Sequence, residues 1–209
     1  MERIGFTRDD MATFGVESPD DRLKLFNDRL RPRLEGVAFR FATPLSRLAG
    51  QPFSAAITLP DSVAPRAQVA ATFILTGKDQ RAGPYFAFGV NRGGVHARLI
   101  IERETMDRER FAKRLNKSAV ALAKELAGSD LRCYDDWTGR GLPAPGMPEK
   151  AAFWRDVAGR LAREAGSLDI GMGWPEARAV LLSYEDLLPA YRSLLPVYRC
   201  VADAIEPRP

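Results

Sequence analysis

The chain has 209 residues, of which 45% are hydrophobic and 28% are charged. These proportions are close to those of average soluble globular domains, and they exclude a disordered, collagen-like or disulfide-scaffold protein. Lys and Arg number 31 against 27 for Asp and Glu, so the net charge is +4. Such an excess, spread over a whole domain, indicates solubility more than a nucleic-acid partner, which needs basic residues clustered on one face.

Metal-binding and targeting signals are sparse in this sequence. Two cysteines, Cys133 and Cys200, and one histidine, His96, are present. Structural zinc sites take four Cys or His ligands and catalytic sites at least three, so a Cys/His zinc site within one chain is excluded unless carboxylates dominate it. The N-terminal residues are charged and no apolar run approaches the length of a membrane span, which predicts a cytoplasmic protein without a membrane partner. The sequence assigns no metal and no cofactor.

The first quarter of the chain predicts helices. Ser18 is a suitable N-cap, because it precedes a proline and two acidic residues. Apolar residues then recur at helical spacing through two predicted helices, 19–31 and 33–49, which internal prolines should kink or split. Gly50 should end the second helix, and residues 51–65, with three prolines, predict an irregular connector.

The centre of the chain changes to the pattern of β-strands. Residues 69–75, 84–90 and 95–102 are short runs rich in Val, Ile and Phe, and the turn at 91–94 predicts that the last two form a hairpin.

Helices dominate again after the hairpin, with two further short strands between them. The predicted elements are helix 107–127, strand 131–134, helix 148–163, strand 168–174 and helix 183–204, the last interrupted by Pro189 and Pro196. A regular strand–helix alternation is missing, so a doubly wound or barrel fold is not expected. We predict one α+β domain, 1–209, with an antiparallel sheet, a central β-hairpin and helices packed mainly on one face.

One face of the predicted hairpin is a candidate ligand platform. If the strands pair about the turn, this face carries Tyr85, Ala87 and Gly89 opposite Ile100, Arg98 and His96. The small Ala87 and Gly89 should leave room beside His96 and Arg98. Space, a titrating imidazole and a fixed cation are what an anion site requires. The alternative is that Arg98 pairs with a carboxylate and His96 is an ordinary strand residue.

Two loops contribute further candidates. The segment 77–84 is not a phosphate-binding P-loop, because it leads into a strand, but Lys78 and Arg81 can approach an anion beside Arg98. Unless it binds a ligand, this segment is a polar turn.

The segment 133–141 is the most unusual polar-aromatic cluster. Asp135 and Asp136 can hold a hard cation or act in acid–base chemistry, and Trp137 with Arg140 can stack on a planar ligand. Otherwise the acidic residues only begin a turn.

Several segments, taken in order, resemble the YktB-like family, a group of bacterial proteins with a domain of unknown function. They are FTRDD (6–10) with Phe14, DRL (21–23), LRPRL (30–34), PYFAFGV (84–90) with Glu102, YDDWT (134–138) and LLPVY (194–198). The resemblance implies one α+β domain and supplies no activity, substrate or catalytic residue. This chain departs from the family pattern at 53–59, where members carry a basic stretch, and at Tyr85 and Trp137, where histidines are expected.

Three functional hypotheses follow. The first is a non-enzymatic protein that binds an anionic ligand, namely a nucleotide, a phosphorylated metabolite or a nucleic-acid backbone. The second is a hydrolase or phosphoryl-transfer enzyme that uses Asp135 and Asp136 with His96 as base. The third is a homodimer formed through the C-terminal helix, whose apolar stripe is rich in tyrosine. The stripe comprises Tyr184, Leu187, Leu188, Tyr191, Leu195 and Tyr198.

Overall fold

The computed structural model of the chain describes residues 2–58, 69–76, 83–134, 144–145, 148–163 and 166–202. The strands are β1 (Phe53–Thr58), β2 (Val69–Leu75), β3 (Tyr85–Asn91), β4 (Gly94–Ile101), β5 (Arg132–Cys133), β6 (Ala144–Pro145) and β7 (Leu168–Pro175). They are hydrogen-bonded in the order β1-β2-β3-β4-β7-β5-β6, and the pairs β1–β2, β2–β3, β5–β6 and β5–β7 are antiparallel. The predicted α+β class, with an antiparallel sheet and a central hairpin, is confirmed.

The chain divides into two compact units. The first comprises residues 1–76, 86–97 and 173–190, and the second comprises 77–85, 98–172 and 191–209. The prediction that residues 1–209 form one domain stays a prediction. We describe each unit by itself.

The first unit begins with helices whose limits follow from local chemistry. These are α1 (Arg8–Ala12), the 3₁₀ turn η1 (Thr13–Gly15), α2 (Pro19–Leu25), the π-helical turn η2 (Phe26–Leu30) and α3 (Arg31–Ala49). Ser18 caps α2 as predicted, since its hydroxyl accepts a hydrogen bond from the Asp21 amide. The predicted boundary between helices at residue 32 is wrong, because the π-helical turn lies within the predicted first helix and leads directly into α3. Pro32 lies in the first turn of α3, where a missing N–H is tolerated, and α3 continues through Pro44. Gly50 ends α3 with a left-handed φ of 74°.

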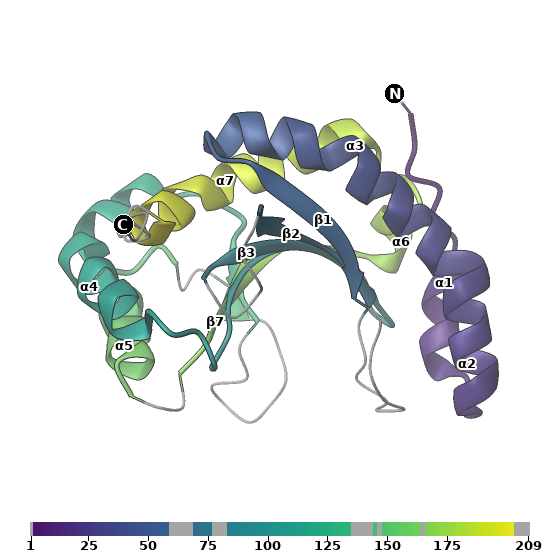
Figure 1. Ribbon diagram of the computed structural model, residues 1–209, viewed down its shortest axis with the longest axis horizontal. Helices are drawn as coiled ribbons and strands as arrows, with labels where there is room; N and C mark the ends of the chain where they lie inside the picture. Colours follow the sequence, from purple (N-terminus) through teal and green to yellow (C-terminus); the bar gives the residue numbers. More distant parts are fainter. Residues whose placement is uncertain are drawn as a thin grey trace. The chain divides into compact units, whose positions relative to one another are not determined.

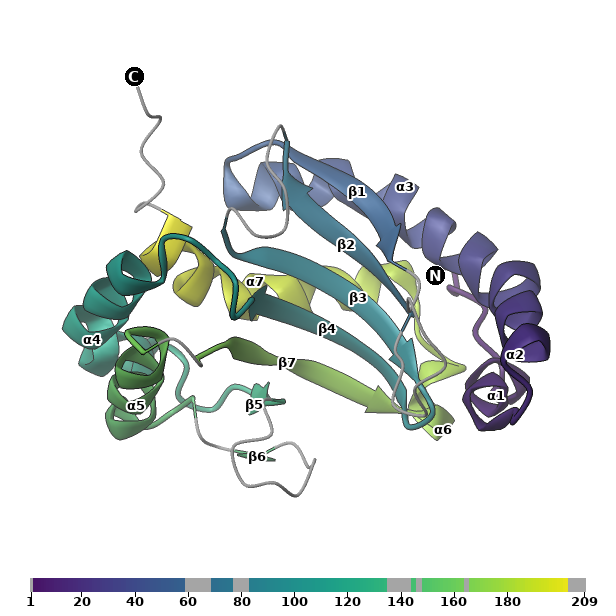
Figure 2. The ribbon, with the colours of Figure 1, turned by 60° about the horizontal axis from the view of Figure 1, so that its bottom comes forward.

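Helix α3 packs against β1 and β2, and Figure 1 shows it lying along these strands. Figure 2 shows β1, β2 and β3 side by side. The predicted connector at 51–65 is wrong in its first half, because Phe53–Thr58 forms β1 and pairs with β2 from Phe53↔Leu75 to Thr58↔Ala70. Residues 59–65 lie outside the described residues. Strand β2 has the predicted limits.

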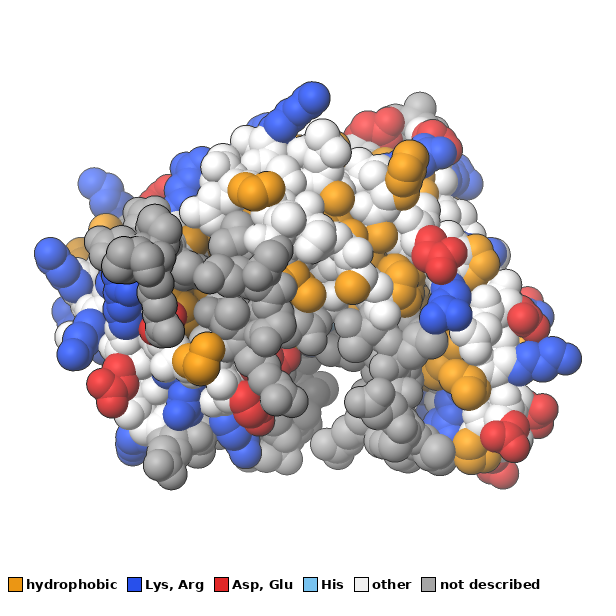
Figure 3. Space-filling view, in the orientation of Figure 1, with side chains coloured by type: hydrophobic (Ala, Val, Ile, Leu, Met, Phe, Trp, Pro, Cys, Tyr) orange, Lys and Arg blue, Asp and Glu red, His pale blue; other side chains and the backbone are white. Residues whose placement is uncertain are grey.

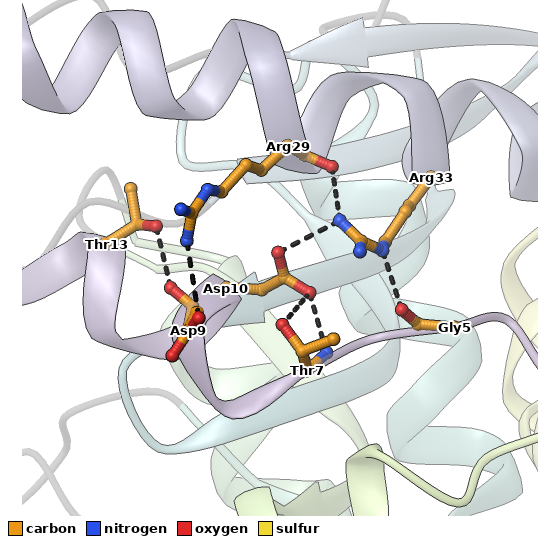
Figure 4. A network of polar contacts seen from close by, with 7 residues as sticks. All are labelled: Gly5, Thr7, Asp9, Asp10, Thr13, Arg29 and Arg33. Atoms are coloured by element: carbon orange, nitrogen blue, oxygen red, sulfur yellow. Dashed lines mark hydrogen bonds and ion pairs between the residues drawn. The ribbon is translucent and has the colours of Figure 1, made fainter.

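An arginine joins the N-terminal segment to the long helix (Figure 4). Arg33 Nη1 donates to Asp10 Oδ1 at 2.9 Å and to the Arg29 carbonyl at 2.7 Å, and Arg33 Nε donates to the Gly5 carbonyl at 2.7 Å. Asp10 is buried and also closes a capping box with Thr7. The segments FTRDD and LRPRL, which carry part of the family resemblance, therefore meet in a structural contact.

The second unit contains a pair of packed helices, α4 (Arg108–Glu125) and α5 (Ala151–Leu161). Each has one buried apolar face, with Phe111 and Leu115 on α4 and Trp154 and Val157 on α5. The Trp154 indole N–H donates to the Pro148 carbonyl at 2.8 Å, so its one polar atom is satisfied. The sequence predicts both helices, 107–127 and 148–163, with limits that agree with the structure to within a few residues.

The last helices are α6 (Glu176–Ala179) and α7 (Tyr184–Ala202). The Ser183 amide and hydroxyl both donate to the Asp186 carboxylate at the start of α7. The predicted interruption of this helix by Pro189 and Pro196 is wrong, because α7 is continuous through both.

Most of the predicted tyrosine-rich stripe on α7 belongs to the core. Leu187, Tyr191, Leu195 and Tyr198 are buried, whereas Tyr184 and Leu188 are partly exposed. The homodimer hypothesis stays a prediction. Among the described residues, none of the helices combines the length and apolar character needed to cross a membrane.

Candidate functional site

The predicted platform on the hairpin is filled rather than open. His96 is buried, and its ring lies over Gly89: a Cβ built at Gly89 would come within 2.2 Å of His96 Nε2. The two residues are therefore neighbours across β3 and β4, as the sequence predicts. The predicted room beside the imidazole is wrong, because the ring itself occupies the space left by the missing side chain of Gly89.

Arg98 is held in an ion pair. Its Nη1 donates to Asp169 Oδ2 at 2.8 Å, and the side chains of Arg98 and Asp169 are only 8% and 18% exposed. The guanidinium also stacks on the ring of Tyr134, with 4.1 Å from its carbon to the ring centroid. The Tyr134 amide donates to the Asp169 carbonyl at 2.7 Å, which ties the three residues together. Asp169 neutralises Arg98, so this guanidinium is poorly suited to receive a ligand anion.

Tyr85 lies in the same buried polar cluster of the second unit. Its hydroxyl donates to Glu102, and burial, followed by this hydrogen bond, raises the pKa of Tyr85 well above its ordinary value. Burial is also the main cause of the raised pKa of Tyr134. Both phenols therefore stay neutral at physiological pH, and they supply hydrogen bonding and packing rather than charge.

The remaining predicted site residues fall in two segments outside the described residues. Lys78 and Arg81 lie in 77–82, and a second group lies in 135–143. That group comprises Asp135, Asp136, Trp137 and Arg140. Their roles stay predictions, as does the enzyme hypothesis that needs Asp135 and Asp136. The described residues contain no group of three or more His, Cys, Asp or Glu side chains placed to hold a metal.

A groove separates the exposed sides of α4 and α5. It is open to solvent, has a volume of about 410 Å³, and is lined by Ala112, Ala158, Gly159 and Ala162 with a polar rim. The rim consists of Glu109, Lys113, Asn116 and Arg155. A second hollow of about 580 Å³ shares Glu109, Lys113 and Ala162 with it and continues toward Arg108 and Arg110. Small residues at the helix contact leave this space, since no long side chain fills the gap between the helices.

The polar face of α4 carries a row of basic side chains, which we call the basic stripe. It consists of Arg110, Lys113, Arg114, Lys117 and Lys124. At 100° per residue these positions lie within a sector of about 100°, away from the buried face. Lys113, Lys117 and Lys124 are exposed, and none of them takes part in an ion pair with another described residue. Figure 3 shows Lys and Arg side chains gathered over α4 and α5.

The basic excess of the chain is concentrated on this helix. Helix α4 holds six basic and two acidic residues, a net charge of +4 that equals that of the whole chain. The interpretation of the +4 excess as evenly spread is therefore corrected. The helical spacing of the cations is visible in the sequence, on the side of the helix opposite the apolar residues that predict its buried face.

Two curated proteins are similar to this chain. A UPF0637 protein of Bacillus velezensis is 25% identical over 130 residues, which cover 61% of this chain and 62% of that protein. A UPF0637 protein of Bacillus licheniformis is 40% identical over 50 residues, which cover 24% of each. No family model matches the chain. These similarities to UPF0637 proteins, the YktB family, support the resemblance of the chain to YktB-like proteins.

The YktB-like relationship leaves the activity open. The matched regions span about three fifths of the first relative and a quarter of the second, and neither relative's name states a ligand or a reaction. The basic stripe and the groove beside it are therefore the features of the described residues that point to a ligand.

Proposed function

We propose that this protein is a non-enzymatic binding protein whose ligand is a nucleic-acid backbone, held along the basic stripe of α4. The observation that carries this proposal is the alignment of five cations on one helix face, three of them exposed lysines without an ion-pair partner among the described residues. Clustering on one face distinguishes an electrostatic binding surface from an even surface charge.

The length of the stripe favours a polyanion over a small phosphorylated molecule. Arg110 and Lys124 are fourteen residues apart on α4, which corresponds to about 21 Å along the helix axis. Phosphates of one strand follow each other at about 3.4 Å along a duplex, so several can lie along this length. A mononucleotide or phosphorylated metabolite would engage only one part of it.

The salt dependence of binding tests the proposal. Anisotropy of a labelled single-stranded oligonucleotide is measured between about 50 and 200 mM salt for wild type and for Lys117→Gln/Lys124→Gln. Each lost phosphate contact lowers the slope of log K against log salt by about 0.7 for a single strand, so the double variant should lose about 1.4. Affinity should fall most at low salt.

The matched control is Lys24→Gln/Arg47→Gln, which removes two exposed cations from α2 and α3 and changes the net charge equally. The control should keep the wild-type slope. Absence of binding by wild type at low salt, or an equal loss in both double variants, would contradict a specific role for α4.

A further inference from the structure

We propose that the groove between α4 and α5 receives one base of a single-stranded nucleic acid whose phosphates lie along the basic stripe. This inference rests on the proposed function and extends it from the backbone to the base. The connection is Lys113, which belongs to the stripe and also lines both hollows. A strand that follows the stripe therefore passes the mouth of the groove.

The dimensions and floor of the groove suit a flat ring. Its volume of about 410 Å³ lies within the range of about 300–1,000 Å³ that is usual for small-molecule sites. The floor residues Ala112, Ala158 and Gly159 are small, and an added Cβ at Gly159 would meet nothing within 4 Å. A ring can therefore lie against the helices without displacing a side chain.

The rim supplies the polar groups that a base requires. Arg155 can stack its planar guanidinium on the ring. The Asn116 amide offers a donor and an acceptor, and the Glu109 carboxylate offers an acceptor for an exocyclic amine. Bases in a duplex are stacked and paired, whereas those of a single strand can turn out into such a site.

The test compares two strands with the same phosphates. One is an oligonucleotide of adenines and the other is an abasic strand of equal length, so any difference in affinity comes from the bases. Stacking contributes about 1–3 kcal/mol per base, so wild type should bind the adenine strand about fivefold or more tightly. Ala162→Leu places a larger side chain in both hollows. It should lower the ratio of the affinities for the adenine and abasic strands toward one and leave the affinity for the abasic strand unchanged.

The matched control is Ala152→Leu, the same substitution at an exposed position of α5 outside the groove, and it should retain the preference. Gly159→Leu is a second groove-filling variant, and circular dichroism checks that each variant is folded. Equal binding of both strands by wild type, or a preference for adenine that persists in both groove-filling variants, would overturn this inference. The proposed binding of the nucleic-acid backbone along the basic stripe would not be affected. Failure of wild type to bind either strand would overturn the proposed function as well.

Discussion

Removing one partner of the ion pair between Arg98 and Asp169 should strongly destabilise the second unit. The two side chains are 8% and 18% exposed, with 2.8 Å between Arg98 Nη1 and Asp169 Oδ2. Removing one partner of a buried pair leaves an uncompensated charge and typically costs about 3–5 kcal/mol. Because Asp169 keeps some solvent contact, we expect Arg98→Met to lower the free energy of unfolding by about 3 kcal/mol.

Urea unfolding followed by circular dichroism measures this loss, and a double-mutant cycle assigns it to the pair. The double variant Arg98→Met/Asp169→Leu should lie within about 1 kcal/mol of wild type, since replacing a buried pair with apolar residues is often neutral. Arg31→Met is the control, because the Arg31–Glu35 pair is exposed and should contribute at most about 0.5 kcal/mol. Additive losses at the two positions, or a loss below about 1 kcal/mol for Arg98→Met, would refute the reasoning.

The Arg98→Met variant also distinguishes the two proposed anion sites, which are Arg98 on the hairpin and the basic stripe of α4. If Asp169 commits Arg98 to a structural role, folded Arg98→Met binds the oligonucleotide with an unchanged salt slope. A slope shallower by about 0.7 would instead place a phosphate at Arg98, as the sequence hypothesis holds.

Two further predictions concern buried groups. Gly89→Ala should destabilise the protein by about 1–3 kcal/mol in urea unfolding, because the new Cβ overlaps the His96 ring, and adding His96→Ala should relieve that loss. Gly159→Ala, where the new Cβ meets nothing within 4 Å, is the control. A Gly89→Ala protein as stable as wild type would contradict the contact. The raised pKa of Tyr85 means that the unfolded chain releases this proton first as pH rises. The contribution of the Tyr85 phenol to the free energy of unfolding is therefore fully present below about pH 10 and is lost above it. Above about pH 10 the free energy of unfolding should fall more steeply in wild type than in Tyr85→Phe, by about 1.4 kcal/mol per pH unit. Equal pH dependence in the two proteins would show that the phenol is not shielded.

Local chemistry was sufficient to predict the elements whose limits are set by neighbouring residues. Strand β2, the hairpin β3–β4, the Ser18 cap and the Gly50 terminus all follow from side chains within a few positions. The pairing of Gly89 with His96 also follows, since the turn sets the register of a hairpin.

The sequence predictions that are wrong concern elements whose structure depends on contacts between residues far apart in the chain. Strand β1 has weak β-propensity in its Ser-Ala-Ala stretch, and it forms by pairing with β2, whose residues follow in the chain. Helix α7 continues through Pro189 and Pro196 because buried side chains such as Tyr191 and Tyr198 hold it in place, which outweighs the lost backbone hydrogen bonds.

Sequence alone determined the class of the fold, the hairpin and the identity of the cations, because composition and short-range spacing carry that information. Only the tertiary structure decided which cations are available. Arg98 is neutralised by Asp169, which is 71 positions away in the chain, whereas the lysines of α4 lie on the helix face that packing leaves exposed. A charge acts on a ligand only where burial and ion pairing leave it accessible, and both depend on contacts between residues far apart in the chain.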